Sequence, residues 1–303
     1  MVRNAVTRFM VRQILHVARA ALARNPTPAR LRKAMARIGP LLARRESYSA
    51  SASFAIGACS GRWIEPSDVA TDSVILYLHG GAYVVESRAI HDPLLAAIGR
   101  AGAARGLMVD YRLAPENPFP AAIEDCYAAW NHLLSSGIDP GRVVIAGDSS
   151  GGGLALVTAM RARDEGMPQA AGLLLLSPAL DWTFSGASVR RNDGLDPLFR
   201  ASSLKLLEPY YGTGMDLRDP RLSPLFGDLA ELPPALLLVG STELLLDDSV
   251  RYASRATAST LLIWHDLPHV FPAIRGLVAG DQALREIGEF IRERTAAATT
   301  GAG

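Results

Sequence analysis

A serine between glycines is the clearest chemical signal in this sequence. Residues 147–152 read Gly-Asp-Ser-Ser-Gly-Gly and place Ser149 at the centre of a Gly-x-Ser-x-Gly pattern. An apolar run at 143–146 precedes the pattern, and a helix-like stretch that begins at Leu154 follows it. A strand, a sharp turn and a helix in this order form a nucleophile elbow, in which the serine lies at the positive end of the helix dipole. The spacing therefore predicts that Ser149 is the nucleophile of an acyl-transfer reaction.

A serine nucleophile needs a base, and two histidines follow Ser149 in the chain. His269 lies in a loop just after the apolar run at 261–264, whereas His265 comes directly at the end of that run. In a fold of alternating strands and helices, a base on the loop that follows the last strand can reach the elbow. We therefore predict that His269 is the base and that His265 makes a local polar contact.

The base in turn needs a carboxylate that orients it. Glu243 is the first carboxylate after the apolar run at 235–239. Asp247 and Asp248 come four and five residues later, where they suit the N-cap and first turn of the next helix. Glu243 has no such structural explanation and is the predicted orienting acid, with Asp247 as the alternative.

Small residues follow the first strongly apolar run, at 74–78. After His79 the chain continues with Gly80, Gly81 and Ala82. Such residues let backbone N–H groups come within hydrogen-bonding distance of the negative oxygen that develops during acyl transfer. We predict an oxyanion hole whose donors come from Gly80, Gly81 and Ala82, together with the N–H of Ser150.

The elements that must position these groups alternate along the chain. Short unbroken apolar runs separated by helical patterns predict an α/β fold, with a mostly parallel central sheet and helices on both of its faces. The predicted strands are 74–78, 106–111, 143–146, 173–176, 235–239 and 261–264, and the predicted helices include 89–105, 118–135 and 282–294.

Two segments fall outside this alternation. Residues 181–222 carry several aromatic side chains between two predicted core strands, which favours a cap insertion over the active site. Residues 1–45 contain eleven Lys or Arg and no Asp or Glu, with apolar residues at helical spacing. We expect residues 1–48 to form a basic helical cap segment and 49–303 to form the catalytic domain. A mitochondrial-type presequence or a membrane-surface helix is the alternative for the N-terminal segment.

Composition limits the remaining choices. No apolar stretch approaches the roughly 18 residues of a transmembrane helix. Cys59 and Cys126 do not make a disulfide framework, and they fit free thiols in a reducing compartment such as the cytoplasm. The sequence shows no metal-ligand spacing, so we expect neither a metal nor another cofactor. A nucleic-acid partner is not expected either, and a homodimer is left open.

Together the motifs resemble the hormone-sensitive-lipase family of α/β-hydrolases. The resemblance rests on the His-Gly-Gly at 79–81, on Asp-Tyr-Arg-Leu-Ala-Pro-Glu at 110–116, on the Ser149 pattern and on His269, and it covers about residues 70–295. It implies an α/β-hydrolase fold with a helical cap, and a serine carboxylesterase that hydrolyses short- to medium-chain esters. It also implies that the 110–116 segment braces the loops near the oxyanion hole.

Two positions depart from the family pattern. Ala82 stands where the family has a third glycine, and Glu243 stands where the family has an aspartate in an Asp-Pro-Leu context. The alternatives to a general esterase are a dedicated deacetylase or a lactone hydrolase, which would use the same residues. A catalytically silent small-molecule receptor is a third class, and the presence of Ser149, Glu243 and His269 argues against it.

Overall fold

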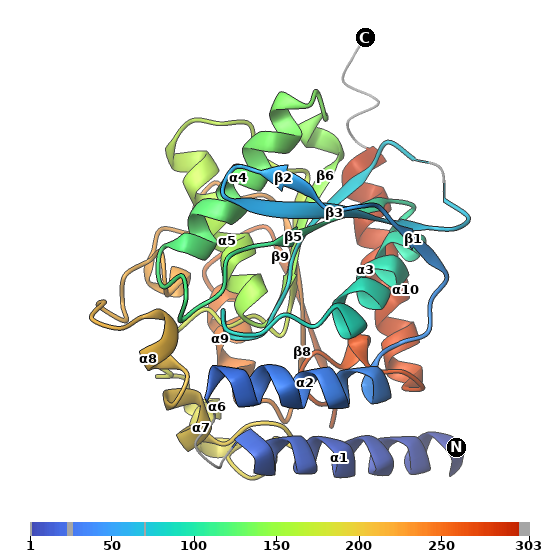
Figure 1. Cartoon of the computed structure of the whole chain (residues 1–303), viewed down its shortest axis with the longest axis vertical. Coiled ribbons are helices and arrows are strands. Elements are labelled where there is room, and N and C mark those ends of the chain that lie inside the picture. The colour runs from blue at the N-terminus through green and yellow to red at the C-terminus, as the bar shows by residue number, and fades with distance from the viewer. Residues whose placement is uncertain (1, 23–26, 70, 297–303) are drawn as a thin grey trace.

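The computed structural model describes residues 2–22, 27–69 and 71–296 (Figure 1). Within these ranges, one nine-stranded sheet runs through the molecule in the order β1-β3-β5-β4-β6-β7-β8-β9, and β2 pairs with β3. The strands are β1 (Tyr48–Ala50), β2 (Phe54–Ile56), β3 (Cys59–Pro66), β4 (Val74–Leu78), β5 (Arg105–Asp110), β6 (Val143–Asp148), β7 (Gly172–Leu176), β8 (Ala235–Gly240) and β9 (Ser259–Trp264).

In the spatial order of the sheet, the strands β5, β4, β6, β7, β8 and β9 run parallel to one another. The strands β1, β2 and β3 form antiparallel pairs at the other edge. In β4, Leu76 lies opposite Leu107 of β5 on one side and Ile145 of β6 on the other. The predicted core strands are therefore confirmed, because strands buried on both faces read as unbroken apolar runs. The three strands β1 to β3 were not predicted: β1 and β2 have only three residues each, and β3 is largely polar.

Helices cover both faces of the sheet, as expected (Figure 1). The helices α3 and α10 pack together on one face, and α4 and α5 pack together on the other. The α-helices are α1 (Val2–Leu22), α2 (Pro28–Leu42), α3 (Arg88–Gly102), α4 (Ala121–Ser135), α5 (Ser150–Asp164), α6 (Ala187–Arg191), α7 (Ala201–Lys205), α8 (Glu208–Tyr211), α9 (Leu246–Ala253) and α10 (Val278–Ala296). Short 3-10 helices lie at Pro140–Arg142, Pro224–Phe226 and Phe271–Ala273.

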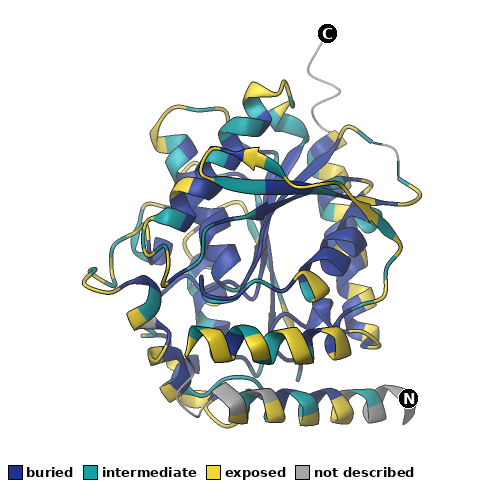
Figure 2. Ribbon diagram, in the orientation of Figure 1, coloured by how far each residue is buried: buried dark blue, intermediate teal, exposed yellow. Residues whose placement is uncertain are grey.

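The alternation of side chains along β4 divides the core into two layers. Leu76 packs on the side of α4 with Trp130, while Ile75 packs on the side of α3 and α10 with Leu95 and Ile291. All of these side chains are fully buried, and the dark interior of Figure 2 follows the sheet. Burial of apolar surface on both faces of the sheet is the main stabilising contribution to such a fold.

The helices α1 and α2 lie side by side at one edge of the domain (Figure 1). Thr27 caps α2 by accepting a hydrogen bond from the N–H of Arg30, and Pro28 occupies the first helical turn. Arg12 of α1 pairs with Asp266 after β9 at 2.7 Å, which ties α1 to the body of the protein. Figure 2 shows exposed residues along α2, and Phe9, Met10 and Val17 of α1 are exposed as well.

Both cysteines are free thiols, as predicted. Burial raises the pKa of Cys59 to about 12, so this thiol is protonated and unreactive at neutral pH. Among the described ranges, each helix is either too short or too polar to cross a lipid bilayer.

Candidate active site

Ser149 lies at a strained turn between β6 and α5. Its backbone has φ 54° and ψ −124°, a combination that non-glycine residues rarely adopt. The end of β7 and the loop after it hold Ser149 there: Ser149 N–H donates to Leu176 O at 2.8 Å, and Ala179 N–H donates to Ser149 O at 2.9 Å. Strain of this kind persists only where the surrounding structure over-determines the backbone, which is typical of a functional turn.

The glycines around Ser149 are required by close backbone contacts. A Cβ atom on Gly147 would lie 2.2 Å from Gly151 O, and one on Gly151 would lie 1.9 Å from Leu78 O. No side chain fits at either position. The elbow is therefore packed directly against the ends of β4 and β6.

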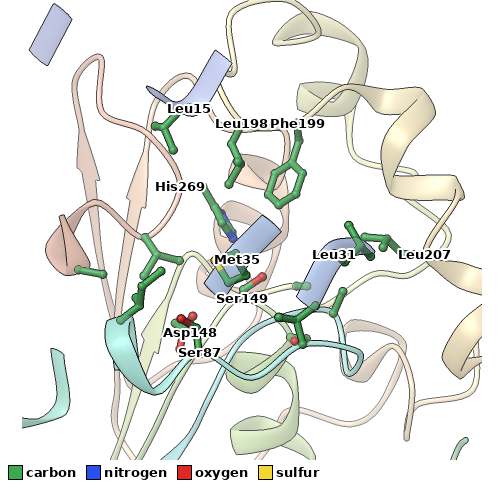
Figure 3. Close-up of a pocket in the computed structure, with 18 of the residues that line it drawn as sticks. Leu15, Leu31, Met35, Ser87, Asp148, Ser149, Leu198, Phe199, Leu207 and His269 are labelled. Carbon is green, nitrogen blue, oxygen red and sulfur yellow. The ribbon is translucent and has the colours of Figure 1, made fainter. Parts of the chain in front are cut away.

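His269 and Glu243 meet beside Ser149, although 26 positions separate them in the sequence. His269 follows β9 and Glu243 follows β8, and the two strands are parallel neighbours. The Nδ1 atom of His269 lies 2.8 Å from Oε2 of Glu243. The other ring nitrogen, Nε2, is buried without a partner among the described residues. Figure 3 shows the ring of His269 directed toward Ser149.

Glu243 is fully buried and held from a second side. Its Oε1 accepts hydrogen bonds from Ser177 Oγ at 2.8 Å and from Gly240 N–H at 2.5 Å. Ser177 also accepts a hydrogen bond from Val270 N–H at 3.0 Å, so one hydroxyl fixes both the acid and the histidine loop. Sequence reasoning missed Ser177; the available signal was a serine directly after the strand at 173–176.

The environment of His269 makes it a stronger base than a free imidazole. Burial alone would lower its pKa, but the hydrogen bond and the charge of Glu243, with further contributions from Asp196 and Asp148, outweigh burial and raise the pKa. The carboxylate at Nδ1 also fixes the tautomer, because it keeps the proton on Nδ1 and leaves the lone pair on Nε2.

The other candidates from the sequence lie elsewhere. Asp247 accepts a hydrogen bond from Ser188 N–H at 2.9 Å and pairs with Arg191, so its carboxylate binds the 181–222 insertion and not His269. His265 is exposed at the end of β9. Asp247 and Asp248 lie in the first turn of α9, as expected, but the expected N-cap was wrong. Neither aspartate caps the helix, because both carboxylates bind backbone N–H groups of the insertion and its approach.

The loop after β4 brings backbone N–H groups to Ser149, with one difference from the prediction. The N–H of Gly80 donates to Asp148 Oδ1 at 2.9 Å, so this group is not free to bind an oxyanion. The N–H groups of Gly81, Ala82 and Ser150 have no hydrogen-bond partner within the described part of the chain. Gly81 has φ +122°, and a Cβ there would lie 1.9 Å from Val85 O.

Asp148 anchors this loop to the elbow. Its Oδ1 also accepts a hydrogen bond from Tyr77 at 2.8 Å, and Oδ2 lies 3.6 Å from Nε2 of His91. Burial would raise the pKa of Asp148, but the charge of His91 and the hydrogen bonds from His91, Tyr77 and Gly80 lower it to about 2. The carboxylate is therefore ionised throughout the range in which proteins work.

The 110–116 segment braces the same loop, as the resemblance implied. Tyr111 donates a hydrogen bond of 2.7 Å to His79 O, and its ring stacks on the His79 ring with 4.2 Å between centroids. Arg112 forms a bidentate pair with Asp125, and Glu116 pairs with Arg32 of α2 at 2.7 Å. Burial lowers the pKa of His79 to about 4, so its ring is neutral.

A cavity of about 410 Å³ contains Ser149 and His269 (Figure 3). Its lining is mostly apolar and comes from α2, the loop after β4 and the 181–222 insertion. The lining includes Leu31, Met35 and Ile38 of α2, Leu15 of α1, and Phe199, Leu204 and Leu207 of the insertion. Phe199 also contacts the His269 ring edge-on, with 5.1 Å between centroids.

Comparisons with known proteins identify the fold and the family of this chain. Residues 75–273 match a family model described as the alpha/beta hydrolase fold. An acetyl-hydrolase of Streptomyces hygroscopicus is 38% identical over 245 residues, which cover 79% of this chain and 82% of the relative. An esterase of Acinetobacter venetianus is 35% identical over 229 residues, covering 72% of this chain and 74% of the relative.

Solved structures give the same answer over nearly the whole chain. A crystal structure of an esterase from the bacterial hormone-sensitive lipase family superposes with a TM-score of 0.89 at 34% identity, covering 95% of this chain and 98% of that one. The crystal structure of EstE5 soaked with ethyl alcohol has a TM-score of 0.89 at 36% identity, covering 96% and 99%. The chain therefore belongs to the hormone-sensitive-lipase family of α/β-hydrolases and is a carboxylic ester hydrolase.

Proposed function

We propose that Ser149, His269 and Glu243 form the catalytic triad of this esterase. His269 Nε2 takes the proton of the Ser149 hydroxyl while the serine oxygen attacks the ester carbonyl carbon. The resulting imidazolium gives that proton to the oxygen of the leaving alcohol as the ester C–O bond breaks. Glu243 keeps the imidazole in the required tautomer and stabilises its charged form.

The second half of the reaction releases the acid. His269 takes a proton from a water molecule, and the hydroxide attacks the acyl carbon of the acyl-enzyme. The bond to Ser149 then breaks, and the serine oxygen recovers its proton from His269. The N–H groups of Gly81, Ala82 and Ser150 stabilise the oxyanion in both halves. Each such donor contributes roughly 10²–10³-fold to the rate.

The observation that carries this proposal is the contact between Glu243 and His269. A fully buried carboxylate bonds one ring nitrogen, and the other nitrogen is buried, unpartnered among the described residues and directed at a strained serine. His79 and His91 also have one buried ring nitrogen without a partner in the part of the chain that the structure describes, but His269 differs from both because a carboxylate lies 2.8 Å from its other nitrogen and its ring is directed toward Ser149. The available N–H groups near Ser149 complete the arrangement that acyl transfer requires.

The decisive experiment is removal of the nucleophile. We expect Ser149→Ala to lower the rate of p-nitrophenyl butyrate hydrolysis by about 10⁴–10⁶ and to abolish labelling by a fluorophosphonate. Ser135→Ala, a substitution on the exposed end of α4, is the matched control and keeps both properties. Retention of more than about one per cent of the activity by Ser149→Ala would exclude the assignment.

We propose further that α1, α2 and the 181–222 insertion form a cap that selects short- to medium-chain esters. The cavity is small and mostly apolar, and Met35 of α2 lines it together with Ser149 (Figure 3). The methyl group of Ala82 adds bulk at the oxyanion loop where the family has glycine. An acyl series from acetate to palmitate tests this: we expect kcat/KM to peak between butyrate and octanoate, and a peak at palmitate contradicts the proposal. Lactones and acetylated alcohols in the same panel separate an esterase from a lactone hydrolase or a deacetylase.

A further inference from the structure

The loop that carries Glu243 is held from the outside by the 181–222 insertion. Three polar side chains of the insertion, Ser188, Asn192 and Asp196, occur at intervals of four residues and all bond to residues 241–247. All three are almost completely buried. We call these three residues the clasp. They are not members of the triad, and their sequence context gave no sign of a role in the site.

Asn192 donates hydrogen bonds to two main-chain carbonyl groups of the loop at residues 241–247, which carries Glu243 and is called the acid loop below. Its Nδ2 donates to Glu243 O at 2.7 Å and to Ser241 O at 3.0 Å. The Glu243 carbonyl accepts one further, longer hydrogen bond, from Leu246 N–H at 3.4 Å, so loss of Asn192 removes the shorter of its two bonds. The carbonyl of Glu243 is therefore fixed by a side chain from another part of the chain.

Asp196 holds the next residue and the insertion at once. Its Oδ2 accepts a hydrogen bond from Leu244 N–H at 3.0 Å. Its Oδ1 accepts hydrogen bonds from the N–H groups of Leu198 and Phe199 at 2.8 and 3.0 Å. Phe199 is the residue whose ring contacts His269. One carboxylate thus connects the peptide unit after Glu243 with the aromatic ring beside the base.

Ser188 completes the clasp through reciprocal bonds. Its hydroxyl donates to Leu244 O at 2.7 Å and accepts from Asp247 N–H at 3.0 Å. The Asp247 carboxylate in return accepts from Ser188 N–H at 2.9 Å. The acid loop therefore has side-chain bonds to the insertion at residues 241, 243, 244 and 247.

We propose that the clasp is a positioning device of the reaction, through which the insertion fixes the direction in which Glu243 meets His269. Glu243 is longer by one methylene than an aspartate and has one more rotatable bond, so holding its carboxylate in a single position costs more side-chain entropy. The inference rests on the proposed role of Glu243 as the orienting acid. Asn192 and Asp196 are positioning residues, because they act through Glu243 and the His269 environment and do not contact Ser149.

Asp196 has a second effect, through its charge. The charged groups that face His269 are Glu243, Asp196 and Asp148, and all three stabilise its protonated form. Burial raises the pKa of Asp196, whereas the N–H groups of Phe199, Leu244 and Leu198 and the charge of His269 favour its ionised form. Arg19 of α1 bonds only the main-chain oxygen of Asp196. Loss of the Asp196 charge therefore favours neutral His269 at a lower pH.

A double-mutant cycle tests the positioning role. We expect Asn192→Ala to lower kcat for p-nitrophenyl butyrate about tenfold with KM within about twofold, because a misplaced catalytic group slows the chemical step more than it weakens binding. In a Glu243→Gln background, the same substitution is expected to change kcat by less than about twofold, since the group being positioned is already disabled. A tenfold loss in both backgrounds, or no loss in the wild type, overturns the proposal.

The pH profile provides a second test with a matched control. We expect Asp196→Asn to move the acid limb of kcat/KM to lower pH, and Asp193→Asn to leave the limb where it is. Asp193 is an exposed carboxylate three residues away that pairs with Arg200. If the Asp196→Asn variant folds and its acid limb does not move, the proposed effect of the Asp196 charge on His269 is wrong. If that variant does not fold, the Asn192 cycle decides alone.

The Glu243→Gln protein also separates this inference from the proposed function. A large loss of activity in Glu243→Gln, combined with wild-type behaviour of Asn192→Ala and Asp196→Asn, overturns the clasp and leaves the triad intact. Near-wild-type activity of Glu243→Gln instead overturns the triad assignment, and the clasp with it.

Discussion

The carboxylate of Asp148, one residue before Ser149, accepts a hydrogen bond of 2.9 Å from the N–H of Gly80. The elbow and the loop after β4 are therefore joined directly, and the peptide groups that follow Gly80 are oriented by the residue that precedes the nucleophile. The same bond removes Gly80 from the set of oxyanion donors. It leaves the N–H groups of Gly81 and Ala82 for that role.

We expect Asp148→Asn to lower kcat about 10- to 100-fold with little change in KM. The amide retains an oxygen for Gly80 but loses the charge that strengthens the bond, so the donors of the loop are held less firmly. Steady-state kinetics with p-nitrophenyl butyrate check the expectation. Asp164→Asn, at the exposed end of α5, is the control for charge, and equal effects in the two variants would contradict the role of Asp148.

The raised pKa of His269 predicts the pH dependence of the enzyme. The neutral imidazole is the base, so activity is lost as pH falls through the raised pKa, and the acid limb of kcat/KM lies above the ordinary histidine value of about 6.5. Glu243→Gln removes the main stabilising charge, so the limb moves to lower pH while the rate falls by about 10³ or more.

Asp247→Asn is the matched control for Glu243→Gln. Its carboxylate binds Ser188 and Arg191 and does not face His269, so we expect a loss of less than about tenfold and an unmoved limb. A larger loss in Asp247→Asn than in Glu243→Gln would reverse the assignment of the acid.

Chain order was sufficient to predict the residues that meet at the site, because parallel strands bring their carboxyl ends to one edge of the sheet. Ser149, Glu243 and His269 each follow such a strand, and each was expected where the structure has it. Ser177, Asn192 and Asp196 were not predicted, since a single serine, asparagine or aspartate has no periodic signature. Their roles arise from tertiary hydrogen bonds to segments about 50 to 90 residues away.

The antiparallel strands β1 to β3 escaped prediction for a related reason. Arg62 of β3 is fully buried because it pairs with Asp92 and Asp110, and a sequence pattern assigns such an arginine to the surface. The Gly80 amide is a further case: small residues predict that the backbone can approach an oxyanion, but not which N–H another carboxylate has already bound.

Gly81→Ala is expected to lower kcat by at least about 10²-fold, because a methyl group there would lie 1.9 Å from Val85 O and forces the loop to move. Gly137 offers a matched control, with φ +79° and no atom within 4 Å of the place that a methyl group would take. Gly137→Ala is expected to cost about 1–2 kcal/mol of folding free energy and leave kcat unchanged. Urea unfolding and kinetics on both variants separate backbone strain from the loss of oxyanion donors.

The buried carboxyl group of Asp248 should make the free energy of unfolding depend on pH. Burial raises the pKa of this carboxyl to about 7, above the 3.8 of the unfolded chain. The folded state therefore holds a proton that the unfolded state releases, and this contribution to the free energy of unfolding declines as pH rises from about 4 to about 7. Asp248→Asn removes the decline, so the stability difference between pH 5 and pH 8 shrinks by something on the order of 2 kcal/mol.

Urea unfolding of the wild type and Asp248→Asn at the two pH values measures this difference. The amide oxygen can still accept the bonds from Leu180 and Asp181, which the carboxyl now accepts at 2.8 and 3.1 Å. A variant that loses the same stability at both pH values would show that Asp248 does not titrate in this range.

Because the elbow is tightly packed, the reactivity of Ser149 should report on the unfolding of the whole domain. Its backbone is bonded to Leu176 and Ala179, and the glycine two residues on presses against Leu78, so the turn cannot relax while these strand ends stay together. Covalent capture of Ser149 by a fluorophosphonate should then disappear together with the sheet, in one transition with the same midpoint. Labelling kinetics across a denaturant series would thus measure global unfolding through a single side chain.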